Sequence, residues 1–168
     1  MASKNYASLR AAVVDGRAQN VFYKRTQLEH LHKNLVKNAT AIQDAIVADT
    51  GNTPAEAKIE YTLTLNTLRD QYVQLDAKKA LDEEYAVARK QNASGLRVGA
   101  GIVVIQPATY SLVYSVLAPL IAAIAGGNCV VVQVSSLIGT KIGFEKRNQT
   151  NETSCYSWRT TFGKCHPC

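Results

Sequence analysis

The cysteines come first among the residues that could do chemistry, because a thiol can serve as a nucleophile, a redox group or a metal ligand. Three of the four lie near the end of the chain, where Cys165 and Cys168 flank His166 in a CHPC sequence with redox-motif spacing. Zinc sites usually combine two separated ligand pairs, and this segment offers one pair with the histidine held between its members. We therefore predict no metal site, and a redox role for the CHPC sequence stays as an alternative.

Cys129 stands apart from that group, inside the apolar sequence NCVVV, which is typical of a β-strand. No His, Lys or Glu lies near it in the sequence to stabilise a thiolate. We interpret Cys129 as a buried structural cysteine and not as a nucleophile.

The polar residues that follow two apolar runs are the second kind of candidate. The runs within 101–106 (GIVVIQ) and 129–134 (CVVVQV) predict buried strands, and LVYSVLAPLIAAIA between them predicts a helix that Pro119 splits or kinks. Strand, helix and strand in this order predict a parallel β-α-β unit. Because ligands of such sheets bind beyond the carboxyl ends of the strands, Gln106–Ser111 and the segment from Gln133 are the candidate binding segments.

The residues on either side of the predicted helix also suit its two ends. The hydroxyls in ATYS (108–111) are placed to cap its start, and GGN (126–128) is placed to end it. Neither binding segment contains the GxGxxG phosphate loop, so these residues alone do not identify a dinucleotide site.

The long uncharged stretch raises the question of a membrane, since no charged residue occurs from Gly99 to Ser136. Pro107 and the GGN sequence interrupt it, which favours a buried β-α-β core over a membrane span. The net charge of +6 is divided equally between residues 1–133 and 134–168, and neither part interleaves a basic run with aromatics, so we expect no nucleic-acid partner. The first residues lack the apolar run of a secretory signal, which predicts a reducing, cytoplasmic location.

The first half of the chain predicts helices that would cover this core. Residues 6–19 predict a helix, and residues 21–49 predict one long helix that Gly51 ends, with an apolar stripe of Leu28, Leu31, Leu35, Ala39, Ile42 and Ile46. The sequence TPAE at 53–56 predicts a capping box that starts a further helix, whose apolar face carries Tyr61, Leu65, Leu68, Tyr72 and Leu75. Residues 76–94 are charged and predict a solvated helix or linker.

Two long segments of the chain match the motifs of one known family, in the same order. GIVVIQPATYSLVYSVLAPLIAAIAGGNCVVVQV is similar to the pattern G-x-x-x-x-I-x-P-W-N-[YF]-P, a helix, then P-L-x-x-A-L-A-x-G-N-x-V-V-x-K, and DTGNTPAEA is similar to D-x-G-x-x-x-x-E-A. On these motifs residues 7–133 resemble the aldehyde dehydrogenase superfamily. The resemblance implies an α/β fold with an N-terminal helical segment (1–95) and an incomplete Rossmann-like β-α-β unit that begins an NAD(P)-binding domain (96–133).

The resemblance also implies roles for individual residues. The family's turn after the first strand lies along the cofactor, which implies cofactor contacts at Ile105, Gln106, Pro107, Ala108 and Thr109. Thr109 takes the place of the Asn that helps to form the oxyanion hole, so it is the implied catalytic residue, with a shorter donor than the amide. Gln133 takes the place of a Lys that contacts the adenosine ribose, and Ser136 that of an acidic residue three positions further on.

The implied activity is the oxidation of an aldehyde to a carboxylate, with NAD or NADP as the hydride acceptor. The family's nucleophilic Cys and general-base Glu lie far downstream of the matched segment, so we expect the chain by itself to be inactive. The alternative is a non-catalytic interaction or regulatory fragment that associates, as a homo- or hetero-oligomer, with full-length dehydrogenase subunits.

Residues 134–168 do not continue the resemblance, and their lack of an amphipathic period predicts a disordered tail. QVS at 133–135 is also what an exon end followed by an intron start encodes in frame, so a translated intron is an alternative origin of the tail. A sheet of two strands would leave a hydrophobic edge, which predicts poor solubility.

Overall fold

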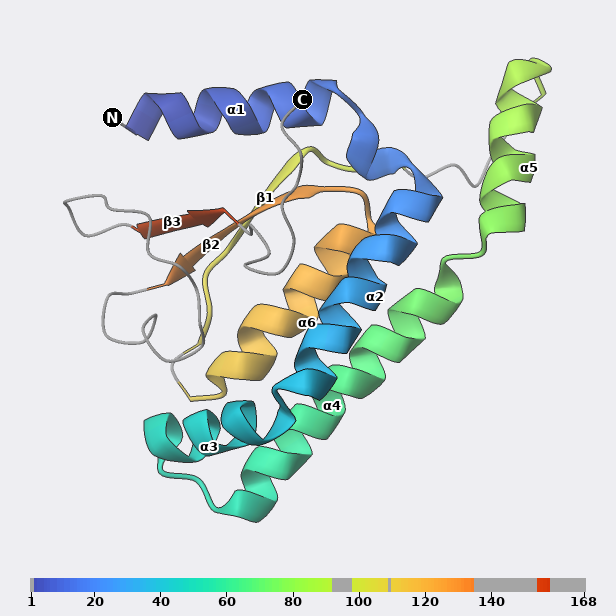
Figure 1. The fold of residues 1–168 in the computed structure, drawn as a ribbon. Helices are drawn as coiled ribbons and strands as arrows, with labels where there is room; N and C mark the ends of the chain where they lie inside the picture. The colour runs from blue at the N-terminus through green and yellow to red at the C-terminus, as the bar shows by residue number, and fades with distance from the viewer. Residues whose placement is uncertain (1, 92–97, 109, 135–153, 158–168) are drawn as a thin grey trace.

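Helices α2 (Val21–Lys37) and α4 (Pro54–Gln74) pack against α6 (Leu112–Ala125), and α6 contacts both strands of a parallel pair (Figure 1). This architecture comes from a computed structural model, which describes residues 2–91, 98–108, 110–134 and 154–157. The other elements are α1 (Ala2–Val14), the short 3₁₀ helix η1 (Arg17–Gln19), α3 (Ala39–Thr50), α5 (Ala77–Ala88), β1 (Ile102–Ile105), β2 (Cys129–Val134) and β3 (Ser154–Ser157).

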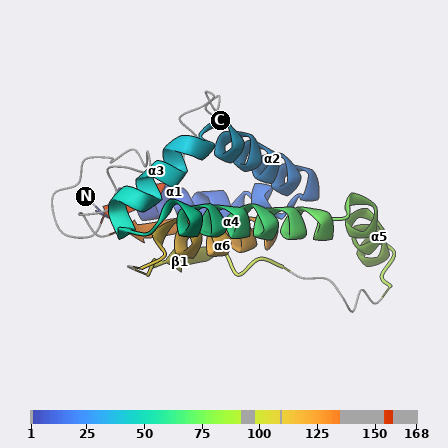
Figure 2. The same cartoon turned by 90° about the horizontal axis from the view of Figure 1, so that it is seen from below.

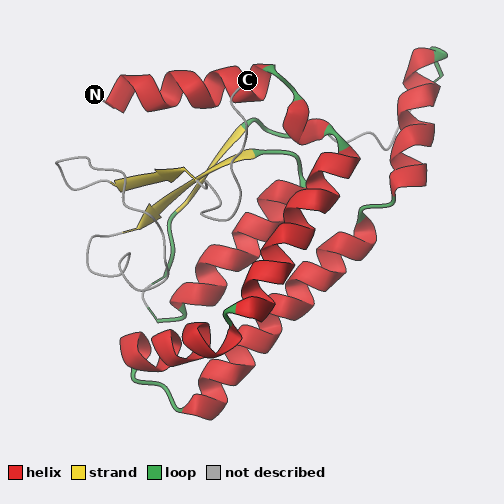
Figure 3. Ribbon diagram, viewed as in Figure 1, coloured by secondary structure: helices red, strands yellow, loops and turns green. Residues whose placement is uncertain are grey.

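The sheet contains the predicted parallel pair and one further strand (Figure 3). β1 pairs with β2 in parallel, from Ile102 opposite Cys129 to Ile105 opposite Val132, and α6 connects the two strands. The predicted α/β class with a β-α-β unit is therefore confirmed. β3 pairs antiparallel with the other side of β2, so the sheet order is β1-β2-β3.

The third strand is a difference from the prediction, which had two strands followed by a tail. β3 comes from residues 134–168, and it covers the edge of β2 that we expected to be exposed. Apart from Val134, which ends β2, the rest of that segment, including the CHPC sequence, lies outside the described residues. The divisions at residues 95 and 133 stay predictions.

α6 runs without a break from Leu112 to Ala125, so the expected split at Pro119 is wrong. Pro119 lies on the exposed side of the helix, where the backbone carbonyl that loses its donor can be hydrated. The opposite side is deeply buried, and Leu120 and Ile121 belong to one core with Leu28 of α2. This burial explains why the segment carries no charge. None of the described helices has both the length and the apolarity needed to cross a membrane.

The single long helix predicted over residues 21–49 is also wrong, because the chain breaks at Asn38 into α2 and α3. Asn38 leaves the helical conformation (φ −107°, ψ 22°), and its side-chain Nδ2 donates to the carbonyl of Asn34 at 2.9 Å. Asparagine favours such local bonds to the backbone over a continued helix. The break turns α3 toward the start of α6 and α4, where Ile46 is buried.

The predicted helix boundaries that rest on capping residues are confirmed. Gly51 ends α3 with a left-handed conformation (φ 72°), and its N–H donates to the carbonyl of Val47 at 3.0 Å. Thr53 and Glu56 form the capping box of α4, with Glu56 Oε2 accepting from the Thr53 N–H at 2.8 Å. The start of α4 is thus fixed independently of tertiary contacts.

The charged segment after α4 forms α5, which extends beyond the end of α4 and contacts α2 (Figure 2). None of its residues is buried. This confirms the predicted solvated helix.

Candidate active-site edge

The candidate site lies at the edge where β1 and β2 both end, which we call the carboxyl edge (residues 106–108, 110, 111 and Gln133). Ile105 and Val132 are the last paired residues of the two strands, so Gln106 and Gln133 follow them directly and lie next to each other. Ile105 is buried, Gln106 is exposed and Gln133 is half-buried. The structure therefore brings together Gln106 and Gln133, which the 26 residues 107–132 separate in the sequence.

The turn from β1 into α6 is held by a serine of the helix. Pro107 and Ala108 are half-buried, and the Ala108 N–H donates to Ser115 Oγ at 3.1 Å. The same hydroxyl donates to the carbonyl of Leu112 at 3.1 Å. Ser115 thereby connects the turn to the first turn of α6, although sequence reasoning gave it no role. The implied site residues Thr109 and Ser136 lie outside the described residues.

A second unpredicted residue, Glu60 of α4, reaches the start of the same helix. Its Oε1 accepts a hydrogen bond from the Tyr114 N–H at 2.9 Å. Ser111 occupies the N-cap position, but its side chain makes no capping hydrogen bond to the described residues, so the predicted capping by ATYS hydroxyls is not found for Ser111. The first turn of α6 has backbone N–H groups without helical partners, and a carboxylate from another helix satisfies one of them.

Glu60 was detectable in the sequence as an acid on an apolar helix face. It lies between the buried Ala57 and Thr64 at steps of three and four residues, beside Tyr61. Its side chain is only 8% exposed. A charged residue at such a position needs a partner, although the sequence alone could not show that the partner is a backbone N–H.

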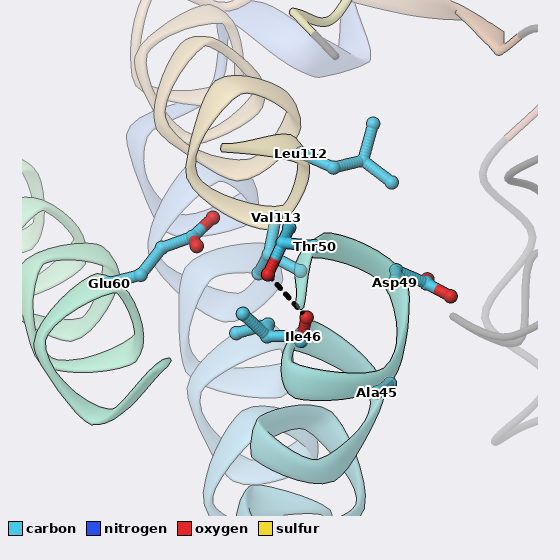
Figure 4. Close-up of a pocket in the computed structure, with 7 residues that line it drawn as sticks. All are labelled: Ala45, Ile46, Asp49, Thr50, Glu60, Leu112 and Val113. Atoms are coloured by element: carbon cyan, nitrogen blue, oxygen red, sulfur yellow. Dashed lines mark hydrogen bonds between the residues drawn. The ribbon is translucent and has the colours of Figure 1, made fainter. Parts of the chain in front are cut away.

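A small pocket lies beside Glu60 (Figure 4) and is hardly larger than one water molecule. Glu60 and Asp49 are its acidic residues, and the other lining residues are Ala45, Ile46, Thr50, Leu112 and Val113. The pocket is therefore too small to hold a nucleotide.

The carboxyl edge has side-chain amides and backbone groups that can bind a ligand, but its own segment of the chain supplies no cationic side chain. Residues 98–136 contain no Lys or Arg. The side chains of Gln106 and Gln133 can each donate to and accept from a hydroxyl, which fits the ribose of a dinucleotide. No cationic side chain from this segment is present to pair with a phosphate.

Cys129 lies at the opposite end of β2 and is half-buried. Burial raises the pKa of its thiol, which keeps it protonated at neutral pH. Both its position and its protonation fit the interpretation of a structural cysteine. Among the described residues there is no group of His, Cys, Asp and Glu side chains that could hold a metal ion.

The opposite end of the β-α-β unit, which we call the amino edge (99–101 and 126–129), is closely packed. Gly127 has φ 75° and is buried, and a Cβ there would lie 2.9 Å from the carbonyl oxygen of Ala18, and equally close to Gln19 and Lys24. Burial lowers the pKa of Lys24. The predicted role of GGN in ending the helix is confirmed, because Gly126 is the C-cap of α6.

Side chains join the amino edge to the first helices. Gln19 Nε2 donates to the carbonyl of Gly127 at 3.2 Å, and Gln19 Oε1 accepts from the Gly99 N–H at 3.2 Å. Asn128 Oδ1 accepts from the Gly101 N–H at 3.0 Å. The small residues at this edge therefore have a packing explanation.

Comparison with known proteins finds distant similarity to aldehyde dehydrogenases of family 3. The chain is 30% identical over 141 residues to aldehyde dehydrogenase family 3 member B1 of Bos taurus, which covers 77% of this chain and 28% of that protein. It is 29% identical over 163 residues to member B1 of Homo sapiens, with 89% and 33% covered. It is 28% identical over 164 residues to member B2 of Mus musculus, with 89% and 32% covered.

The chain spans about a third of the length of these curated relatives. The resemblance to aldehyde dehydrogenases is thereby confirmed as a distant and partial similarity. No family model matches the chain, and no solved structure matches it significantly.

Proposed function

We propose that the carboxyl edge contributes to the binding of NAD or NADP in an aldehyde-oxidising enzyme. One observation carries this proposal: the parallel β-α-β unit places Gln106 and Gln133 together at the edge where sheets of this kind bind ligands. The similarity to family 3 aldehyde dehydrogenases supports the choice of reaction. When bound, the dinucleotide supplies the acceptor for the hydride that leaves the substrate carbon.

The residues of this edge would bind and orient the dinucleotide. The Gln133 amide would bond to a ribose hydroxyl, and Ser115 would keep the backbone of Ala108 in place beneath it. Thr109 would donate its hydroxyl to the oxygen that becomes negative during the reaction, and Ser136 would lie near the ribose. A single donor of this kind contributes about 10²–10³ in rate, and a threonine reaches less far than an amide.

We expect the 168-residue chain alone to show no aldehyde oxidation. Cys129, the thiol whose surroundings the structure describes, lies at the amino edge and has a raised pKa, so it is neither close to the proposed site nor activated. Incubation with NAD⁺ and a panel of aldehydes, followed by NADH absorbance, measures this. Activity above the blank that survives Cys129→Ser would show a nucleophile elsewhere in the chain.

The binding proposal is tested by titrating the chain with NAD⁺ and with NADP⁺ while the amide signals of Gln106 and Gln133 are followed by NMR. Gln133→Leu should weaken NAD⁺ binding, and Gln133→Lys should strengthen it about tenfold because a charged donor bonds more strongly to hydroxyls and attracts phosphate. The affinity for NADP⁺ should increase more than the affinity for NAD⁺ in Gln133→Lys. Gln74→Lys at the end of α4 makes the same substitution away from the edge and should change neither affinity. No shift at either glutamine with millimolar NAD⁺ would contradict the proposal.

One observation favours a second candidate function, association with full-length dehydrogenase subunits. β1 pairs on one side with β2 and is the outer strand of the described sheet, and its Val104 is 57% exposed. Co-expression with a full-length family 3 aldehyde dehydrogenase should then give co-purification. Val104→Lys should abolish it, whereas Val36→Lys, at a comparably exposed valine of α2, should not. Equal co-purification of the wild-type, Val104→Lys and Val36→Lys chains, or of none of them, would contradict this function.

A further inference from the structure

We propose that Glu60 of α4 is a positioning residue for the ligand-binding turn at the carboxyl edge. The proposal rests on the proposed function for its link to a ligand, but the position of the turn can be tested without one. A side chain of the N-terminal helical layer would thus control the geometry of a site that belongs to the sheet.

Glu60 accepts a hydrogen bond from the backbone N–H of Tyr114. The two residues are 54 positions apart, and the Tyr114 N–H lies 2.9 Å from Glu60 Oε1. Tyr114 is the third residue of α6, where backbone N–H groups have no partner within the helix. Without Glu60 this partly buried N–H would lose its acceptor in the protein.

Ser115 connects the first turn of α6 to the turn that follows β1. Ser115 follows Tyr114 directly, and its Oγ accepts from the Ala108 N–H at 3.1 Å. Its own N–H donates to the carbonyl of Ser111 at 2.9 Å. A change in the position of Tyr114 would therefore move both bonds that Ser115 makes to the turn, so the position of Ala108 depends on Glu60.

Glu60 itself has little freedom to move, because it is buried. Glu60 is 8% exposed and lies between the buried Ala57 and Thr64 of α4, and α4 packs against α6. A buried carboxylate is costly unless it is hydrogen-bonded, so Glu60 is held where the Tyr114 N–H satisfies it. Its charge also favours the amino end of α6 through the helix dipole.

The test compares Glu60→Met, which keeps the volume of the side chain and removes the acceptor, with Glu60→Gln, which retains an acceptor oxygen. The control is Glu56→Met, one turn earlier on α4, where the carboxylate is exposed and belongs to the capping box. Amide hydrogen exchange measured by NMR reports Tyr114, Ser115 and Ala108 individually.

In Glu60→Met the amides of Tyr114 and Ala108 should exchange about ten- to a hundredfold faster, since a hydrogen bond to a charged group is lost. Glu60→Gln should recover most of the protection, and Glu56→Met should leave both rates unchanged. Unchanged rates in a folded Glu60→Met chain would overturn the proposal. If that variant does not fold, the wild-type chain decides: a Tyr114 amide that exchanges as fast as an unprotected amide contradicts the proposal, and strong protection supports it.

The link to the ligand has its own readout. The dissociation constant for NAD⁺ should rise about tenfold in Glu60→Met and by less than about threefold in Glu60→Gln, with the melting temperature of Glu60→Gln close to that of the wild type. An NAD⁺ affinity that is the same in Glu60→Met as in the wild type would contradict the link. If the wild-type chain binds no NAD⁺, the proposed function fails, while the exchange rates still decide whether Glu60 positions the turn.

Discussion

The two ends of α6 are built in different ways, although both are turns between the same helix and the same sheet. At the amino edge, Gly127 is enclosed by Ala18, Gln19 and Lys24, with little space for any side chain. At the carboxyl edge, Gln106 is exposed and Tyr110 is 78% exposed, and the side chains of Ser115 and Glu60 hold the backbone by accepting one hydrogen bond each from a backbone N–H. One end is fixed by packing, and the other by a few polar bonds around an open surface.

The residues that resemble aldehyde dehydrogenases lie at both edges, and they have different roles at each. The motif AGGN, which is among the most specific parts of the resemblance, lies at the packed amino edge, where it ends α6 and begins β2. Of the residues that we expect to depart from the family pattern, Ala108 and Gln133 lie at the carboxyl edge. The part of the resemblance at the amino edge thus has a packing role in this structure, whereas the roles at the carboxyl edge stay proposals.

The largest expected effect is at the amino edge. Gly127→Ala should lower the free energy of unfolding by about 2–4 kcal/mol, because an alanine would both adopt a left-handed conformation and place its Cβ 2.9 Å from the carbonyl oxygen of Ala18. Gly51→Ala is the matched control, since Gly51 has φ 72° with no atom within 4 Å of the place that a methyl group would take, and it should cost about 1–2 kcal/mol. Urea unfolding of both variants measures the two values. Equal losses would mean that the amino edge is no more closely packed than an exposed helix end.

A smaller effect is expected at the carboxyl edge. Ser115→Ala removes the acceptor for the Ala108 N–H and should lower the free energy of unfolding by about 1 kcal/mol. The Ala108 amide should then exchange faster than in the wild type. Thr62→Ala is the comparison, because the Thr62 hydroxyl bonds only within its own helix, to the carbonyl of Lys58 at 2.7 Å, and the variant should change stability by less than about 0.5 kcal/mol. A larger loss in Thr62→Ala than in Ser115→Ala would contradict the role of Ser115.

The smallest effect concerns the reactivity of Cys129 and its dependence on pH. Burial raises the pKa of this thiol, so the thiolate forms at higher pH in the folded chain than in an unfolded one. The folded chain is therefore stabilised by the protonated thiol at lower pH, and this stabilisation is lost as the pH rises through the raised pKa. Alkylation by iodoacetamide, followed by mass spectrometry of the peptide that contains Cys129, should be slow at about pH 8 and faster in urea at the same pH. Fast alkylation of the folded chain at that pH would mean that Cys129 is more accessible than the packed amino edge allows.

Sequence reasoning succeeded where local patterns determine the structure. The capping box at Thr53, the end of α3 at Gly51 and the order of strand, helix and strand all follow from residues close together in the chain. It failed at Asn38, where a local bond from the side chain to the backbone competes with the helix, and at Pro119, whose exposed position lets the helix continue.

The candidate site was predictable in position but not in the residues that hold it. That Gln106 and Gln133 meet follows from the parallel pairing of their strands. The bond from Tyr114 to Glu60 could not be predicted, because it depends on how α4 lies against α6, which no local pattern specifies. The acid on the apolar face of α4 was the available signal.

The order of the helices along the chain matters during synthesis on the ribosome, because α6 is made long after the helices that it packs against. α2 and α4 are complete well before α6, yet α6 buries the apolar faces of both. At about 5–20 residues per second, the roughly fifty residues from the end of α4 to the end of α6 take about 3–10 seconds to translate. During that interval the nascent helices expose the surface that α6 later covers, which makes them a binding site for chaperones that recognise apolar segments.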